Sequence, residues 1–168
     1  MAVPNPEHLF DQADRLVAAP TGPARQVDLR RAVSSAYYGV FHALAAAAAD
    51  EYVGATKRSE PRYGLAYRSI DHRVVTEVCV EATKAAPSPR YARYVPAEGF
   101  GSELQRFAAA VIELQGKRYA ADYDPGIVLE RADAALTITA GRAAVRRLSA
   151  APADARQAFL ALLLFRPR

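Results

Sequence analysis

The chain has 168 residues and a formal net charge of +4, from 22 Lys and Arg against 18 Asp and Glu. This length predicts one domain with a substantial core, and the abundant alanine, scarce aromatic residues and absent tryptophan favour helix packing over a sandwich of sheets. The single cysteine, Cys79, excludes a disulfide framework and a thiolate metal cluster. We expect a cytoplasmic protein, because no secretory signal follows Met1 and the longest strongly apolar run, Ala158 to Phe165, is too short to span a membrane.

The mild basic excess favours an anionic partner such as RNA or a nucleotide, which would bind with release of counterions. A proteome rich in arginine would produce the same charge balance without any such partner. The net charge alone therefore leaves both interpretations open.

Residues that begin and end helices divide the chain into six helical stretches. Capping side chains, prolines in first turns and acidic residues near N-termini mark the starts, whereas clusters of proline and glycine mark the ends. The predicted helices cover approximately residues 5–18, 28–51, 60–85, 102–123, 127–149 and 152–165. The predicted breakers after the first helix are Pro20, Gly22 and Pro23, and Asp124-Pro125-Gly126 ends the fourth.

These stretches predict an all-α fold, an up-and-down bundle of four to five main helices with a short C-terminal helix over residues 152–165. We expect residues 1–168 to form a single domain whose core spans about residues 5–148. Ser102, with Gln105 three residues later, predicts a capping box for the fourth helix. In the loop over residues 86–101, arginines alternate with tyrosines, which either stack on single-stranded bases or anchor the loop on the bundle.

The second predicted helix has two different faces. At about 100° per residue, its apolar face consists of Leu29, Val33, Ala36, Tyr37, Val40 and Leu44. Arg31, Ser35, Tyr38 and His42 line up on the other side. A solvated face normally carries Lys and Glu, whereas guanidinium, hydroxyl and imidazole groups bind anions or transfer protons. The alternative is that Tyr38 and His42 are hydrogen-bonded residues at a helix interface.

Charged residues enter the inner stripe of the fourth predicted helix. The apolar stripe that begins at Leu104 continues through Arg118 and Asp122, which are four residues apart. Because burying an unpaired charge is costly, one interpretation is a mutually satisfied ion pair. The other is a site where helix ends from two elements or two subunits bring Arg118, Asp122 and the adjacent Tyr123 to a ligand.

A third group of polar residues lies around His72. Arg68 precedes His72 by one helical turn and Arg73 follows it directly, which predicts a basic phosphate-binding patch. The alternative is a solvated face, because His72 lies opposite the apolar residues of its predicted helix. The chain has 3 histidines on different predicted helices and no His-x3-His pair, so we expect no metal ion, and the absence of a glycine-rich phosphate loop predicts no cofactor.

Two segments resemble one protein family. Residues 29–43 (LRRAVSSAYYGVFHA) are similar to the RRAxSxAYYxxFHA signature of HEPN-domain proteins (higher eukaryotes and prokaryotes nucleotide-binding), and residues 118–124 (RYAADYD) resemble the RxxADYD element of one branch. The resemblance covers about residues 5–148 and leaves the last predicted helix outside. It implies a helical bundle, usually dimeric, in a family rich in toxin–antitoxin and defence components, many of which are metal-independent ribonucleases.

In those enzymes an arginine and a nearby histidine carry the reaction. The imidazole moves protons, and the guanidinium stabilises the charge that develops as a ribose hydroxyl attacks its own phosphate. This sequence departs from the pattern, because Asp122 stands four residues after Arg118, where the histidine is expected. The resemblance thus implies that Arg118 binds the phosphate and that Asp122, Tyr123 or His42 acts near the ribose.

The same resemblance assigns the remaining residues and the partners. Arg31 and Tyr38 would shape the site. We expect RNA or a nucleotide as ligand, a homodimer as the assembly, and an antitoxin or a nucleotidyltransferase as a partner protein. The competing interpretations are a catalytically silent module that binds a nucleotide or a partner, and a structural bundle whose polar residues only fix its pairing.

Overall fold

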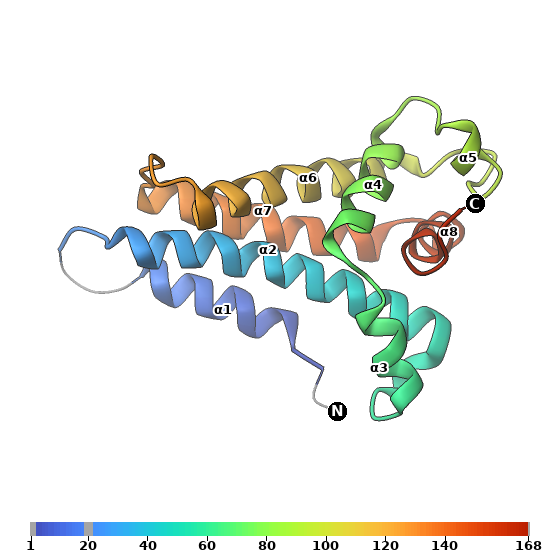
Figure 1. The fold of residues 1–168 in the computed structure, drawn as a ribbon, viewed down its shortest axis with the longest axis horizontal. Helices are drawn as coiled ribbons and strands as arrows, with labels where there is room; N and C mark the ends of the chain where they lie inside the picture. The colour runs from blue at the N-terminus through green and yellow to red at the C-terminus, as the bar shows by residue number, and fades with distance from the viewer. Residues whose placement is uncertain (1–2, 19–21, 168) are drawn as a thin grey trace.

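The computed structural model describes residues 3–18 and 22–167, and their regular structure is entirely helical (Figure 1). The all-α prediction is confirmed for these residues. Pro20, one of the predicted breakers, lies outside them. The helices are α1 (Pro6–Val17), α2 (Gln26–Ala49), α3 (Pro61–Arg68), α4 (His72–Thr83), α5 (Pro89–Ala92), α6 (Gly101–Tyr123), α7 (Arg131–Ala150) and α8 (Ala153–Leu164). A π-helical turn, η1 (Asp50–Gly54), and a 3-10 turn, η2 (Ala55–Lys57), continue α2.

The long helix α2 lies at the centre of the bundle. It contacts α1, α6 and α7, and these four helices lie side by side along the long axis of the molecule (Figure 1). The shorter helix α4 packs against α6, and α8 contacts α2, α4 and α6. All the main helices contribute to one apolar cluster, so a side chain on α2 can meet residues from several elements.

The stretch Gln26–Lys57 is the one candidate membrane span within the described part of the chain, on length and apolar composition. Its most apolar window is 67% buried inside the fold. A central helix of a globular bundle passes the same composition test, because its apolar residues face neighbouring helices on several sides.

The predicted third helix is wrong as a single element, because the chain breaks it into α3 and α4 at residues 69–71. Asp71 caps the second part by accepting a hydrogen bond from the backbone N–H of Val74, 2.8 Å away. The break changes the direction of the chain, so faces calculated across it do not apply. His72 consequently occupies the first position of α4.

Two further helix starts differ from prediction. The predicted Ser102 capping box is wrong, since α6 begins at Gly101 and Ser102 lies inside its first turn. The fifth predicted helix begins at Arg131 rather than Ile127. Glu130 and Asp133 form a capping box there, each side chain accepting a hydrogen bond from the other residue's backbone N–H.

Arg30 joins the end of α6 to α2. Its guanidinium donates hydrogen bonds to the carbonyl oxygens of Ala121 (2.9 Å), Asp124 (2.8 Å) and Ile127 (2.6 Å). The last carbonyls of a helix lack partners within the helix, and a cation also interacts favourably with that end of the dipole. Arg30 thereby fixes the C-terminal part of α6, which carries Arg118 and Asp122, against α2.

Phe10 fixes α1 on α2 and α7. Its ring is 0% exposed and lies over Gly39 of α2 and Gly141 of α7. A Cβ atom at either glycine would come within 2.8 Å of a ring carbon, and one at Gly141 would also lie 3.3 Å from the carbonyl oxygen of Ala36. Because the ring is enclosed from both sides, it cannot move away from an added methyl group.

We predict that Gly141→Ala lowers the free energy of unfolding by about 1–3 kcal/mol, the usual cost of overpacking a core. Urea denaturation measures this change. Gly116→Ala is the matched control, because Gly116 is also helical but has open space where the Cβ would lie. It should be neutral or stabilising by up to about 1 kcal/mol through helix propensity. Equal effects of the two substitutions would contradict the packing at Phe10.

Candidate functional site

Arg118 lies on the buried face of α6 and is only 11% exposed. Its guanidinium forms an ion pair with Asp122, one turn later, at 3.6 Å. The carboxylate of Asp122 also accepts a hydrogen bond from the hydroxyl of Ser34 on α2. The predicted entry of charge into the inner stripe holds for Arg118, which lies at the α2–α6 interface, whereas Asp122 lies at the exposed edge of that interface.

Two tyrosine rings of α2 cover the Arg118 guanidinium. Its central carbon lies 5.3 Å from the ring centroid of Tyr37 and 5.9 Å from that of Tyr38. A guanidinium at such distances from an aromatic face is stabilised by the ring quadrupole. The Nε atom of Arg118 has no hydrogen-bond partner and is the one such buried side-chain atom among the described residues. One donor of the guanidinium is therefore left without a partner at this interface.

Two imidazoles complete the cluster. His72, at the start of α4, shares a 2.7 Å hydrogen bond between its Nδ1 and the Tyr37 hydroxyl. His42 of α2 shares a 2.6 Å hydrogen bond between its Nδ1 and the hydroxyl of Tyr67 on α3. The ring of Tyr38 lies between them, with its centroid 5.9 Å from that of His72 and 6.3 Å from that of His42. The cluster thus draws side chains from α2, α3, α4 and α6.

Both imidazoles favour the neutral form. Burial lowers the pKa of His72 below its usual 6.5, and the nearby positive charge of Arg118 lowers it further. Burial alone lowers the pKa of His42. Burial raises the pKa of the Tyr37 hydroxyl to about 12, against an opposing effect of Arg118. Near pH 7 the cluster therefore holds the Arg118–Asp122 ion pair beside two imidazoles that can accept a proton.

The cluster is open to solvent at the atoms that chemistry would use. His42, His72 and Tyr38 are half-buried, and neither Nε2 nor the Tyr38 hydroxyl has a hydrogen-bond partner among the described residues. None of these three atoms is among the fully buried side-chain atoms that lack a hydrogen-bond partner, so each has some contact with solvent. The positions of the second nitrogen of each imidazole and of this hydroxyl permit contact with a ligand.

Five predicted site residues meet in this cluster, namely Arg118, Asp122, Tyr38, His42 and His72. Arg31 and Arg68 are exposed and make no hydrogen bond, ion pair or ring contact with another described residue. Tyr123 points outward and touches the ring of Tyr119 rather than the imidazoles. The two groups of residues predicted to converge, from the second and fourth predicted helices, thus converge in part.

Three residues of the cluster were not singled out from the sequence. Ser34 and Tyr37 are buried on α2, where the Ser34 hydroxyl donates to Asp122 and the Tyr37 hydroxyl is hydrogen-bonded to His72. Tyr67 is one of the apolar-spaced residues of the third predicted helix, yet its hydroxyl bonds to His42. An available signal was that these three side chains combine a largely apolar position with a hydroxyl, which requires a partner when buried.

The loop around α5 is anchored rather than free. The Tyr91 hydroxyl is buried and donates to the Glu77 carboxylate at 2.7 Å, and Arg90 donates to the carbonyl oxygen of Pro167. This favours the anchoring interpretation of the alternating arginines and tyrosines.

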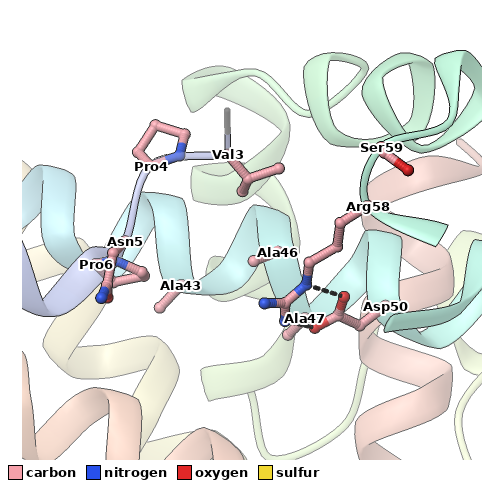
Figure 2. A pocket seen from close by; sticks show the side chains of 10 residues that line it. All are labelled: Val3, Pro4, Asn5, Pro6, Ala43, Ala46, Ala47, Asp50, Arg58 and Ser59. Carbon is pink, nitrogen blue, oxygen red and sulfur yellow. Dashed lines mark hydrogen bonds and ion pairs between the residues drawn. The ribbon is translucent and has the colours of Figure 1, made fainter. Parts of the chain in front are cut away.

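A separate hollow of about 650 Å³ lies between the N-terminal segment and α2 (Figure 2). Alanines of α2 form one wall, and Arg58 and Asp50 neutralise each other across it with a 3.0 Å hydrogen bond from Nε (Figure 2). No histidine is among its described lining residues. No group of three His, Cys, Asp or Glu side chains suited to a metal ion occurs in the described part of the chain. Proton-transfer groups gather instead at the Arg118 cluster.

Comparison of the chain with protein-family models, with curated proteins and with solved structures gave no match.

We predict that lowering the pH below 6.5 destabilises the fold through His42 and His72. Their folded-state pKa values lie below the unfolded value of 6.5, so the unfolded chain binds protons first and stability is lost as the pH falls. Urea denaturation at about pH 7.5 and at about pH 5.5 measures the loss. A His42→Gln/His72→Gln variant should show a flatter dependence, and an unchanged slope would contradict the pKa directions.

Proposed function

We propose that this protein is a HEPN-like, metal-independent endoribonuclease whose active site is the Arg118 cluster. The observation that carries the proposal is the meeting of one partly buried guanidinium with two imidazoles and an accessible phenol. A guanidinium positioned in a site of low dielectric stabilises the charge that develops on a phosphate during transfer. Neutral imidazoles provide the proton acceptor that attack by a ribose hydroxyl requires.

The proposed reaction is an internal transesterification of RNA. The 2′ oxygen forms a bond to the adjacent phosphorus while the bond from phosphorus to the 5′ oxygen breaks. His72 takes the proton of the 2′ hydroxyl on Nε2, in the tautomer whose Nδ1–H donates to the Tyr37 oxygen. The Tyr38 hydroxyl gives its proton to the departing 5′ oxygen, and water returns the proton from His72 to Tyr38.

The remaining members of the cluster position these groups. Asp122 holds the Arg118 guanidinium in place, and the ion-pair distance of 3.6 Å leaves room for a phosphate oxygen to compete for it. His42, bonded to Tyr67, packs beside the Tyr38 ring. The expected homodimer and the antitoxin or nucleotidyltransferase partner stay predictions of the sequence resemblance.

A second function is a silent module that binds a nucleotide through the same cluster. Asp122 favours it, because its carboxylate already neutralises Arg118 and lies where the family's arginine–histidine pattern has a histidine. Such a module would bind a phosphate without cleaving a bond.

We expect the purified protein to cleave mixed single-stranded RNA in EDTA and to leave 2′,3′-cyclic phosphate ends. Arg118→Ala should lower the cleavage rate by about 10²–10³-fold, the usual effect of losing one oxyanion donor. His72→Ala should lower it by about 10²–10⁴-fold through loss of the base, and His42→Ala tests the second imidazole.

Arg146→Ala is the matched control, since Arg146 is an exposed arginine of α7 without an ion pair to another described residue. It should cleave at the parental rate. Equal cleavage by Arg118→Ala and the parent would identify a contaminating nuclease and contradict the proposal. Melting temperatures of all variants confirm that each is folded.

The binding module predicts a different result, which thermal denaturation detects. A nucleotide such as AMP or ATP at about a hundred times its dissociation constant should stabilise the parent by about 2.7 kcal/mol. Arg118→Ala should abolish this stabilisation, because no other side chain in the cluster carries a positive charge near pH 7. Stabilisation of both proteins alike would exclude the cluster as the binding site.

A further inference from the structure

Tyr119 and Tyr123 form an exposed aromatic pair on α6. Their side chains are 64% and 65% exposed, and their ring centroids lie 5.1 Å apart at an interplanar angle of 49°. Neither hydroxyl has a hydrogen-bond partner among the described residues. Two neighbouring tyrosines with most of their surface in water are available to bind a ligand through their ring faces.

This pair directly borders the Arg118 cluster. Around the helix axis, Arg118, Asp122, Tyr119 and Tyr123 follow one another in steps of about 40° to 60°, given about 100° per residue. Asp122 is hydrogen-bonded to Ser34 of α2. Arg31, which is exposed, lies about one turn before Ser34 on α2. The two tyrosine rings therefore lie directly beside the Arg118–Asp122 ion pair on the surface of α6.

On the far side of the tyrosines lies a hollow of about 470 Å³. Gly116, Lys117 and Ala120 of α6 form one wall, and Val128 and Leu136 form part of the other. Lys117 is the cationic residue among these lining residues, and it forms an ion pair with Glu113 at 2.7 Å. The order along the surface is thus phosphate-binding arginine, aromatic pair and apolar hollow beside a lysine.

We propose that Tyr119 and Tyr123 form a base-stacking platform that restricts the substrate to single-stranded RNA. This inference rests on the proposed function, since it takes the scissile phosphate to lie at Arg118. A nucleotide next to that phosphate then places its base on the tyrosine rings. Stacking on aromatic side chains binds bases with little regard to sequence, but it requires a base that is not already paired and stacked in a duplex.

The surface favours RNA over a protein partner for a specific reason. A protein interface is depleted of charge at its centre, whereas the tyrosine pair lies between two ion pairs, Arg118–Asp122 and Lys117–Glu113. Exposed Arg31 adds a third cation on the neighbouring helix. A guanidinium close to two exposed aromatic rings suits a phosphate and the neighbouring unpaired base of a single strand.

The test uses a short fluorescent single-stranded RNA methylated on every 2′ oxygen, which binds but cannot be cleaved because the attacking hydroxyl is blocked. Fluorescence anisotropy gives its dissociation constant. Tyr119→Ala/Tyr123→Ala should weaken binding by about fivefold or more, the range for loss of one stacked base. Tyr119→Phe/Tyr123→Phe keeps both ring faces and should bind like the parent. Tyr94→Ala removes an exposed tyrosine elsewhere, beside Arg93, and should have no effect.

The same RNA annealed to its complement should bind the parent more weakly and respond little to Tyr119→Ala/Tyr123→Ala. Equal sensitivity of duplex and single strand would overturn the platform. The platform would also be overturned if Tyr119→Ala/Tyr123→Ala had an unchanged dissociation constant but a changed molecular mass in sedimentation. The tyrosines would then form a contact between protein molecules.

Cleavage of unmethylated RNA separates this inference from the proposed function. In one possible result, Arg118→Ala abolishes the cleavage seen with the parent, whereas the tyrosine variant cleaves like the parent at subsaturating RNA. This result would overturn the platform but not the proposed nuclease. Tyrosine-dependent binding without any parental cleavage supports the platform and overturns the nuclease. A parent that neither binds nor cleaves single-stranded RNA overturns both.

Discussion

The position of one guanidinium determines the rest of the site. Arg118 continues the buried stripe of α6, and a charge there is tolerated only if its surroundings replace water. Asp122 supplies the opposite charge, and the rings of Tyr37 and Tyr38 supply polarisable faces. The compensation is incomplete, since Nε remains without a partner. Burial lowers the pKa of His72, and the nearby charge of Arg118 lowers it further, so this guanidinium also favours a neutral imidazole beside it.

This arrangement depends on how α2 meets α6. Arg30 of the Arg30–Arg31 pair is structural, because its hydrogen bonds to three carbonyl oxygens hold the end of α6. Arg31 points to solvent at the same level. The two adjacent arginines thus differ in their surroundings: Arg30 holds the end of α6, whereas Arg31 lies at the surface. The α3–α4 break adds the third side of the site, because it brings both Tyr67 and His72 into hydrogen-bond contact with α2.

The helices and the charged inner stripe could be predicted from the sequence because they depend on local spacing. Asn5 caps α1 as expected, and the apolar face of α2 is buried. His72 could not be placed, because the face calculated for it assumed a continuous helix across residues 69–71, whereas Asp71 starts a new helix there. The partners of Ser34 and Tyr37 also could not be predicted, since contacts between distant segments depend on the packing of α2, α4 and α6 and not on periodicity.

The seating of Phe10 has a consequence for the history of this fold. Its ring occupies the space that side chains at Gly39 and Gly141 would fill, so three positions on three helices share one volume. No lineage can gain a methyl group at either glycine while retaining a phenyl ring at position 10 without loss of packing. Proteins that descend from this sequence should therefore change these positions together. A smaller residue at position 10 should appear before a larger residue at position 39 or 141.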